Sequence, residues 1–223
     1  LSSISTSFSH LSSIDLVNQE SKAQLDKLYH LMSDEKVVKA QLALGLKGKS
    51  HPVLKRAIER HAQAIIEGAE AQVERINAAQ SILEQCEAQI KKFPISFADM
   101  DSGQKIQDQQ LLLLFRLNQV VHNSEIKNAL AVLNLKGLPR TAQEALSAKQ
   151  EEIYQAAAKQ NEIVLVAEKN IALYIQRIND FNTTALVGGS NLPLTKKCAF
   201  LINNLRQIPN ESELQNNLGI VSS

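Results

Sequence analysis

Two long stretches of the chain carry the same apolar pattern about 88 residues apart, and this pattern limits what the chain can fold into. In each stretch an apolar or small residue recurs at alternating spacings of four and three, which places the set on one face of an α-helix. We therefore predict two long helices, over about 50–92 and 141–182, each with a heptad seam that packs on another helix. The seam positions are Ile65, Ala69, Gln72, Ile76, Ala79, Leu83, Cys86 and Ile90, and then Ile153, Ala157, Gln160, Val164, Ala167, Ile171, Tyr174 and Ile178.

The similarity extends beyond the seams. Residues 26–48 align with residues 115–137 at an offset of 89, and residues 211–218 align with residues 123–130 at an offset of 88. Agreement is concentrated at apolar positions and helix ends, where a shared fold constrains the sequence; the alternative is chance similarity between Ala- and Leu-rich helices. We predict a first repeat over 1–94 that includes a Ser-rich leader, a second over 95–182 and a partial third over 183–223.

Each repeat is predicted to contain three helices. The first helix runs over about 16–32 and again over 105–121, and a short second helix follows it. We expect the short helix to end at Gly48 or Gly137, because glycine readily takes the left-handed conformation that terminates helices. The predicted fold class is all-α: an elongated array of tandem helical repeats of about 88–89 residues, with long antiparallel helices packed as in coiled coils.

Composition agrees with helices and argues against other classes. Glycine (8), proline (5) and aromatic residues (4%, no Trp) are scarce in 223 residues, and the residues that lose least entropy in helices predominate. A β-sandwich or an α/β nucleotide-binding fold is therefore not expected. A net charge of +1 provides no overall attraction to nucleic acid, and no transmembrane segment is expected because no apolar run exceeds five residues.

Cysteine usage and the N-terminus bear on the compartment. Cys86 and Cys198 are expected to be small core residues rather than a disulfide, which favours a reducing, cytoplasmic compartment. The chain begins at Leu1 without the features of a secretory signal, so we expect a segment of a larger protein. The abundance of Asn, Gln, Ile and Lys suits a secreted bacterial effector that acts in a host cytoplasm or at a membrane surface.

Signatures of catalysis are missing from the sequence. There is no glycine-rich phosphate loop, no His-Glu-x-x-His, no Cys-x-x-Cys and no Gly-x-Ser-x-Gly. We therefore expect no enzyme activity, no cofactor and no metal site.

Basic residues gather around the expected start of the first long helix. Helix N-termini attract anions through free amide groups and the helix dipole, so this basic patch is a candidate site for a phosphoinositide headgroup, an anionic membrane or an acidic protein. The alternative is a charge run that solubilises an exposed helix start. Nucleic acid is not an expected partner, because no aromatic stacking residues accompany the patch. The patch contains Lys47, Lys49, His51, Lys55, Arg56 and Arg60.

A second candidate surface lies between the first two repeats, where a connector would ordinarily be polar. Phe93, Ile95, Phe97 and Met100 form an apolar stretch there. These residues are interpreted either as a plug at the junction of neighbouring repeats or as a hydrophobic contact for a protein partner.

Three functional hypotheses follow. The first is a non-enzymatic scaffold or adaptor that binds a protein partner, since helical arrays expose extended surfaces. The second is a phospholipid-binding module that uses the basic patch. The third is an inert spacer or dimerisation rod within a larger protein.

Overall fold

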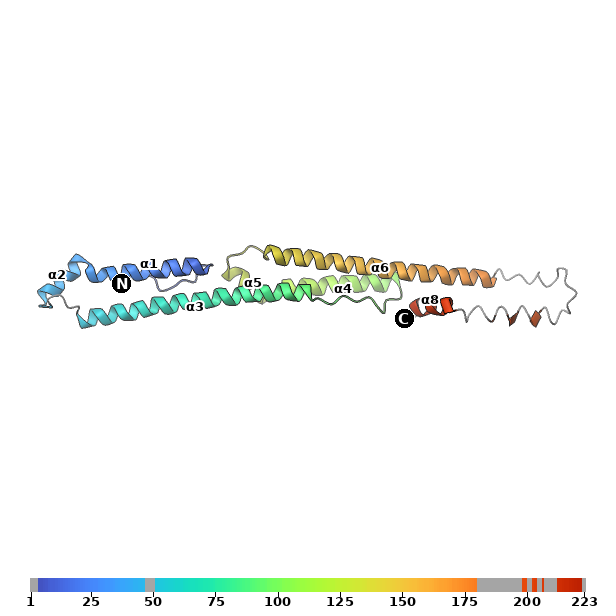
Figure 1. Ribbon diagram of the computed structural model, residues 1–223, viewed down its shortest axis with the longest axis horizontal. Helices are drawn as coiled ribbons and strands as arrows, with labels where there is room; N and C mark the ends of the chain where they lie inside the picture. The colour runs from blue at the N-terminus through green and yellow to red at the C-terminus, as the bar shows by residue number, and fades with distance from the viewer. Residues whose placement is uncertain are drawn as a thin grey trace. The chain divides into compact units, whose positions relative to one another are not determined.

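The computed structural model describes residues 4–46, 51–179, 198–199, 202–203, 206 and 212–221. Within these residues the regular structure is entirely helical, which confirms the predicted all-α class (Figure 1). The helices are α1 (Ile14–Ser33), α2 (Glu35–Ala43), α3 (Pro52–Lys91), α4 (Gly103–Val121), α5 (Ser124–Val132), α6 (Arg140–Asn179) and α8 (Ser212–Val221).

The chain forms two compact units. The first contains residues 1–92 and 119–146, and the second contains residues 93–118 and the described residues from 147 onward. The short helix α5, which belongs to the predicted second repeat, packs along α3 inside the first compact unit. The repeat boundaries at 94 and 182 stay a prediction, and most of the predicted third repeat lies outside the described residues.

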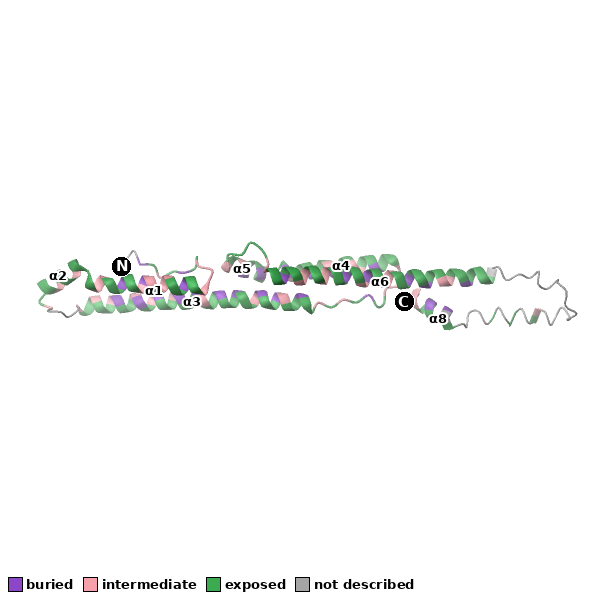
Figure 2. Cartoon of the chain, turned by 45° about the horizontal axis from the view of Figure 1, so that its top comes forward, coloured by how far each residue is buried: buried purple, intermediate pink, exposed green. Residues whose placement is uncertain are grey.

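The core of the first compact unit is built by three segments. Helices α1 and α3 lie side by side (Figure 1), and the leader segment, residues 4–13, runs along both. Buried positions recur along one side of α3 (Figure 2), as the four-and-three spacing predicts, and all eight seam residues of that helix are buried. The central cluster contains Ile4, Phe8, Val17, Leu28, Ile58, Ala62, Ile65, Ala69 and Ile76.

In the second compact unit the linker segment, residues 93–102, occupies the place in the sequence that the leader segment has before α1. Two of its carbonyl groups accept hydrogen bonds from α4 and α6. The side-chain amide of Gln109 donates to the carbonyl of Ser96 (3.1 Å), and that of Gln160 donates to the carbonyl of Met100 (3.0 Å). Further along α6, Tyr174 is buried with Leu214 of α8.

The predicted ends of the short helices are wrong. Helices α2 and α5 end at Ala43 and Val132, and the residues with positive φ that follow are Gly45 (φ 74°) and Asn134 (φ 53°). Gly48 lies outside the described residues, and Gly137 lies beyond the turn that closes α5. Two backbone hydrogen bonds close each helix, as in a Schellman motif. They are Gly45 N to Leu42 O (3.0 Å) and Leu46 N to Gln41 O (3.0 Å), and Asn134 N to Ala131 O (3.1 Å) and Leu135 N to Leu130 O (2.8 Å).

Candidate functional site

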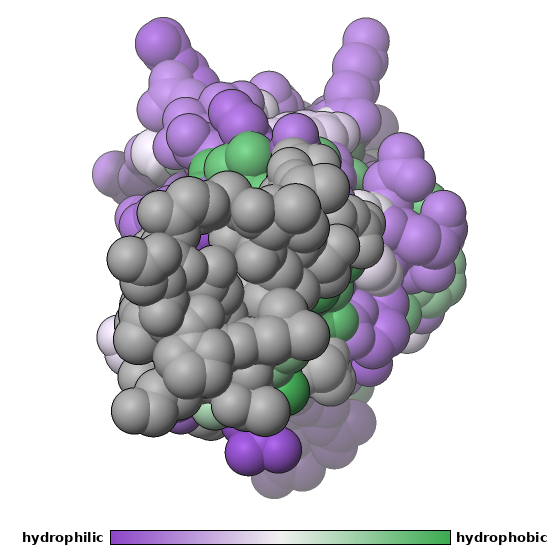
Figure 3. Space-filling view, turned by 90° about the vertical axis from the view of Figure 1, so that its right-hand side faces the viewer, coloured by the Kyte–Doolittle hydropathy of each residue, from purple (hydrophilic) through white to green (hydrophobic). Residues whose placement is uncertain are grey.

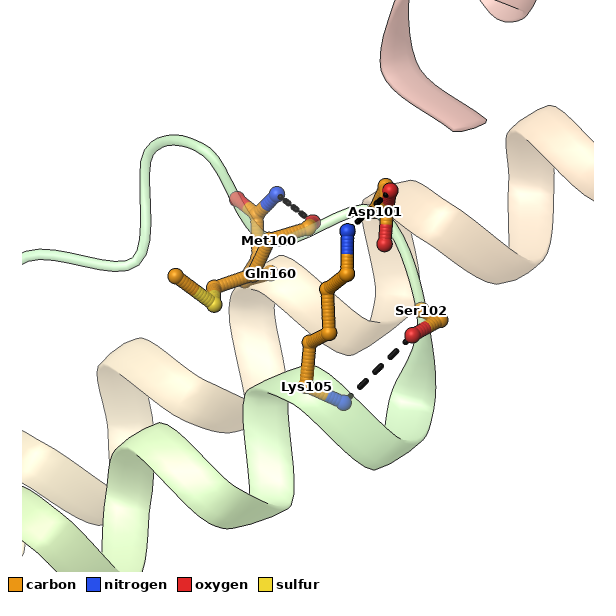
Figure 4. A network of polar contacts seen from close by, with 5 residues as sticks. All are labelled: Met100, Asp101, Ser102, Lys105 and Gln160. Carbon is orange, nitrogen blue, oxygen red and sulfur yellow. Dashed lines mark hydrogen bonds and ion pairs between the residues drawn. The ribbon is translucent and has the colours of Figure 1, made fainter. Parts of the chain in front are cut away.

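In each compact unit, the glutamine of the seam makes a hydrogen bond to a distant part of the chain. Gln72, which is 3% exposed, donates from Nε2 to the carbonyl oxygen of Leu11 at 2.6 Å. Gln160 donates in the same way to Met100 at 3.0 Å (Figure 4). Leu11 and Met100 are 89 residues apart and Gln72 and Gln160 are 88 apart, so both bonds join residues that the sequence alignment pairs. Each glutamine thereby ties its long helix to the segment that precedes the first helix.

The start of the first helix is also built twice in the same way. Ser13 Oγ accepts from the amide of Leu16 (3.3 Å), and Ser102 Oγ accepts from the amide of Lys105 (3.4 Å). Such N-caps satisfy an amide that lacks a partner within the helix. In the second case the Lys105 ammonium also donates to Asp101 (2.6 Å; Figure 4), and this hydrogen bond lowers the pKa of Asp101. The polar residues Asp101 and Ser102 therefore have a structural role at the start of α4.

The apolar stretch between the first two predicted repeats is only partly accessible. Phe97 is 5% exposed, and Phe8, its counterpart in the leader segment, is 2% exposed. Both phenylalanines begin a turn, closed by Met100 N to Phe97 O (3.1 Å) and Leu11 N to Phe8 O (2.9 Å). Phe93, Ile95 and Met100 are half-buried. Contact with a protein partner at this stretch stays a prediction. Of its four residues, only Phe93, Ile95 and Met100 are accessible to such a partner.

The basic patch is exposed where it is described. Lys55, Arg56 and Arg60 are exposed on the first turns of α3, and Lys47 and Lys49 lie outside the described residues. His51 is the N-cap of α3, because its Nδ1 accepts from the amide of Val53 (3.3 Å). The amide of Val53, which a bound anion would otherwise use, is therefore already hydrogen-bonded to the imidazole of His51.

Charge on the patch is partly balanced. Lys55 lies 3.8 Å from Glu59 in an exposed i,i+4 pair, an arrangement that contributes little to stability. Arg56 and Arg60 are one turn apart and share a face of α3. Arg56 and Arg60 are therefore neighbours on the exposed surface of α3.

A groove that the sequence did not predict lies between the first helix and the long helix. In the first compact unit it is a hollow of about 450 Å³ between α1 and α3. In the second it is a hollow of about 500 Å³ between α4 and α6. The first is lined by Asn18, Ser21, Ile66, Ala69, Glu70, Val73 and Glu74, and the second by Gly103, Ile106, Gln107, Gln110, Tyr154, Ala157, Ala158 and Asn161.

The two grooves are formed by corresponding residues. Asn18 and Ser21 precede Gln107 and Gln110 by 89 positions. The residues of α3 that line the first groove, apart from Glu74, precede those of α6 that line the second by 88. The signal in the sequence is a second stripe beside each seam, Ile66-Glu70-Val73 and Tyr154-Ala158-Asn161. Small residues form part of each floor, so a further helix could approach closely.

The grooves differ in charge. Glu70 and Glu74 line the first, whereas alanine replaces glutamate at Ala158 and the second is lined by neutral amides and one tyrosine. The described surface in Figure 3 is mostly hydrophilic with hydrophobic side chains between, and Ile66 and Tyr154 are among the exposed large hydrophobic residues.

A third hollow, of about 530 Å³, lies where the second half of α3 meets the segment after α5. Glu84 and Glu87 line this hollow. Glu87 accepts from Thr141 Oγ1 (2.6 Å) and from the ammonium of Lys91 (2.6 Å). These hydrogen bonds, that of Lys91 first, lower the pKa of Glu87. Glu87 therefore serves as a structural anchor between α3 and the start of α6.

The described part of the chain shows neither a metal site nor a membrane-spanning helix. No group of three or more His, Cys, Asp or Glu side chains is placed there to hold a metal ion, and none of its helices is long and apolar enough to cross a membrane. Cys86 and Cys198 are free thiols. Cys86 is buried, and burial raises the pKa of its thiol, which makes it a poor nucleophile.

Comparison with known proteins returned no match: neither a protein-family model, nor a curated protein, nor a solved structure is similar to this chain.

Proposed function

We propose that the chain is a non-enzymatic helical scaffold or adaptor segment of a larger protein, and that it binds a protein partner in the grooves beside its long helices. The architecture that goes with this proposal is a tandem array of helical repeats of about 88–89 residues, with long antiparallel helices packed as in coiled coils. The observation that carries it is the recurrence of one groove, at corresponding residues, in both compact units.

The groove chemistry suits a helical partner. Two helices form its walls, and Ala69, Ala157 and Gly103 leave room for close helix approach. Ile66 and Tyr154 offer apolar contact, and such large side chains supply most of the free energy of helix-in-groove binding. The glutamates of the first groove favour a partner helix with basic residues along one flank.

The cellular setting is proposed on composition. Free thiols support a reducing cytoplasm, and the Asn-, Gln-, Ile- and Lys-rich composition supports a secreted bacterial effector that works in a host cytoplasm or at a membrane surface.

Affinity capture from eukaryotic cell lysate tests the scaffold function. The wild-type chain is run beside Ile66→Glu and Tyr154→Glu, which put a charge into one groove each. The matched controls are Leu16→Glu and Leu165→Glu, at exposed leucines that do not line the grooves. We expect a stoichiometric protein partner that is lost in a groove variant and kept in both controls. A partner lost equally in the controls would contradict binding in the grooves.

A second candidate function is binding to phosphoinositide or other anionic membrane surfaces. Lys55, Arg56 and Arg60 favour it, because all three are exposed at the start of α3 and a basic residue near an anionic surface contributes about 1 kcal/mol.

Co-sedimentation with phosphoinositide-containing vesicles tests this candidate. Reversing the three charges to Glu should abolish binding, whereas the same reversal at the exposed Arg116, Lys127 and Lys159 should not. Equal binding by both triple variants would exclude the basic patch as a lipid site.

A further inference from the structure

The short helix of each repeat occurs three times in the described structure, as α2, α5 and α8. The three align at offsets of 89 and 88 residues, so corresponding positions can be compared directly. The corresponding positions are Val37, Ile126 and Leu214; Ala40, Ala129 and Asn217; and Leu44, Leu133 and Val221.

Two of the three short helices are packed on a long helix. Ile126 and Ala129 of α5 are each 2% exposed, and α5 lies along α3. Leu214 of α8 is buried with Tyr174 and Ile171 in the second half of α6. In α3 the covering surface lies in the later part of the helix, where Leu83 lines a hollow together with Leu133. In α6 it is formed by Ile171 and Tyr174.

The third, α2, has the same apolar pattern but no such cover. None of its residues is buried, and Leu44 is 68% exposed whereas Leu133, its counterpart, is half-buried against the first core. Among the described helices, α2 contacts α1. The side-chain nitrogen of Gln41 is shielded from solvent and, within the described residues, makes no hydrogen bond.

We propose that this face of α2, formed by Val37, Ala40, Gln41 and Leu44, is the docking site for an α-helix of a partner protein that carries a seam like the second half of α3. The occupied copies specify the occupant: a helix with large apolar residues spaced by three and four, as at Leu83, Cys86 and Ile90. The site is separate from the grooves and does not rest on the function proposed for them.

Charge supports the same occupant. Lys36 and Lys39 are exposed on α2, and Lys39 pairs with Glu35. Glu125 and Asn128 stand at the places of the two lysines on α5, which also carries Lys127, so that α2 has one more positive charge than α5. The seam of α3 is flanked by Glu84 and Glu87. A helix of this type therefore meets a more basic surface on α2 than on α5, which favours docking.

The probe is a synthetic helix made of residues 79–92 of this chain, titrated against the full-length chain and followed by fluorescence anisotropy. A hydrocarbon staple between the positions of Ser81 and Gln85 keeps it helical. Both side chains are exposed on α3, on the side away from the seam, so the staple leaves the contact face unchanged. A second peptide with Leu83→Glu and Ile90→Glu is the control probe.

The matched variants of the full chain are Leu44→Glu and Leu42→Glu. Both leucines are exposed on or just beyond α2, 68% and 58% respectively, but the counterpart of Leu42 is the exposed Ala131 and that of Leu44 is the packed Leu133. Ala40→Glu is the second test variant, because the counterpart Ala129 is buried. Circular dichroism establishes that each variant keeps its helix content.

We expect saturable binding that weakens at least tenfold in Leu44→Glu and in Ala40→Glu, stays within twofold in Leu42→Glu, and is absent with the control peptide. No binding by the wild-type chain would overturn the proposal. Binding that survives Leu44→Glu would also overturn it, since the peptide would then be displacing α3 from α5. So would self-association of the chain that Leu44→Glu abolishes and the peptide does not inhibit, because the occupant would then be a second copy.

Discussion

Among single residues, the seam glutamines are the clearest case of a side chain whose position was visible in the sequence and whose partner was not. A polar residue in a heptad seam is expected to fix the register of a partner helix. Gln72 and Gln160 instead donate to the backbone of the segment that precedes the first helix. Each one therefore sets how that segment lies along the long helix.

We expect Gln72→Ala to lower the free energy of unfolding by about 1–2 kcal/mol, because the carbonyl of the half-buried Leu11 loses its donor. The control is Gln63→Ala on the same helix. Gln63 is bonded only across an exposed i,i+4 pair with Glu67, and its loss should cost less than about 0.5 kcal/mol. Urea denaturation of the two variants measures the difference, and equal midpoints would contradict the role given to Gln72.

Gly68 of α3 is a position where an added Cβ atom is expected to change stability. In an ordinary helix, Gly→Ala stabilises by up to about 1 kcal/mol. Here a Cβ would lie 2.2 Å from the carbonyl oxygen of Thr6, a backbone atom that can move only if the leader segment moves. We expect Gly68→Ala to destabilise the chain by about 1–3 kcal/mol and to raise hydrogen exchange of residues 4–13.

Gly137→Ala is the matched control for this substitution. Its Cβ would come no closer than 3.9 Å to a neighbouring side chain, that of Gln143. We expect hydrogen exchange of the leader segment to be unchanged in this variant. Unchanged exchange in Gly68→Ala as well would show that the leader segment does not depend on the close approach at Gly68.

At the level of helices, the long helix serves two neighbours in turn. The first half of α3 packs with α1 and the leader segment, and its second half packs with α5. Cys86 lies in the second half and is 2% exposed. We expect the accessibility of its thiol to report whether α5 stays docked on α3.

We expect Ile126→Asp to raise the rate of Cys86 labelling by a thiol reagent at least tenfold, in a Cys198→Ala background and at constant pH. The reason is that a carboxylate at a fully buried position detaches α5. Lys127→Asp, at the adjacent exposed position, should leave the rate unchanged. A rate that is the same in both variants would mean that α5 does not cover Cys86.

For the whole molecule, the dependence of stability on pH follows from one carboxylate in each compact unit. Hydrogen bonds from Lys91 and Thr141 lower the pKa of Glu87, and that from Lys105 lowers the pKa of Asp101. A carboxylate with a lower pKa when folded stabilises the fold above its unfolded pKa, which is about 4 for these residues. That contribution disappears as the pH falls through the folded pKa.

We therefore expect the contribution of these two groups to be constant between about pH 7 and pH 5 and to fall below about pH 4. Urea denaturation at a series of pH values measures the total slope. The double variant Glu87→Gln with Asp101→Asn should be less stable at neutral pH and show a shallower loss in acid. A slope identical to that of the wild type would show that neither ion pair contributes.

Most of the helical framework could be predicted because its signals are local. Helix periodicity at Ile65 to Ile90 depends on residues within one or two turns. The same local reasoning misplaced the ends of the short helices. Glycine at position 137 was the stronger propensity signal, but the left-handed residue is Asn134, whose place is set by where Leu135 closes the turn.

From the sequence alone came the all-α class, the two long helices and the pairing of residues 88 or 89 apart, because each depends on a period along one chain. The buried faces of the long helices were predicted in the same way, except at Ile178, which is 42% exposed. The remainder depends on contacts between residues distant in the sequence. These include the bond from Gln72 to Leu11, the packing of α5 on the second half of α3, the groove at Ile66 and Tyr154, and the uncovered face of α2. Such features follow from which surfaces meet in space, and no periodicity along one helix specifies the surface that it meets.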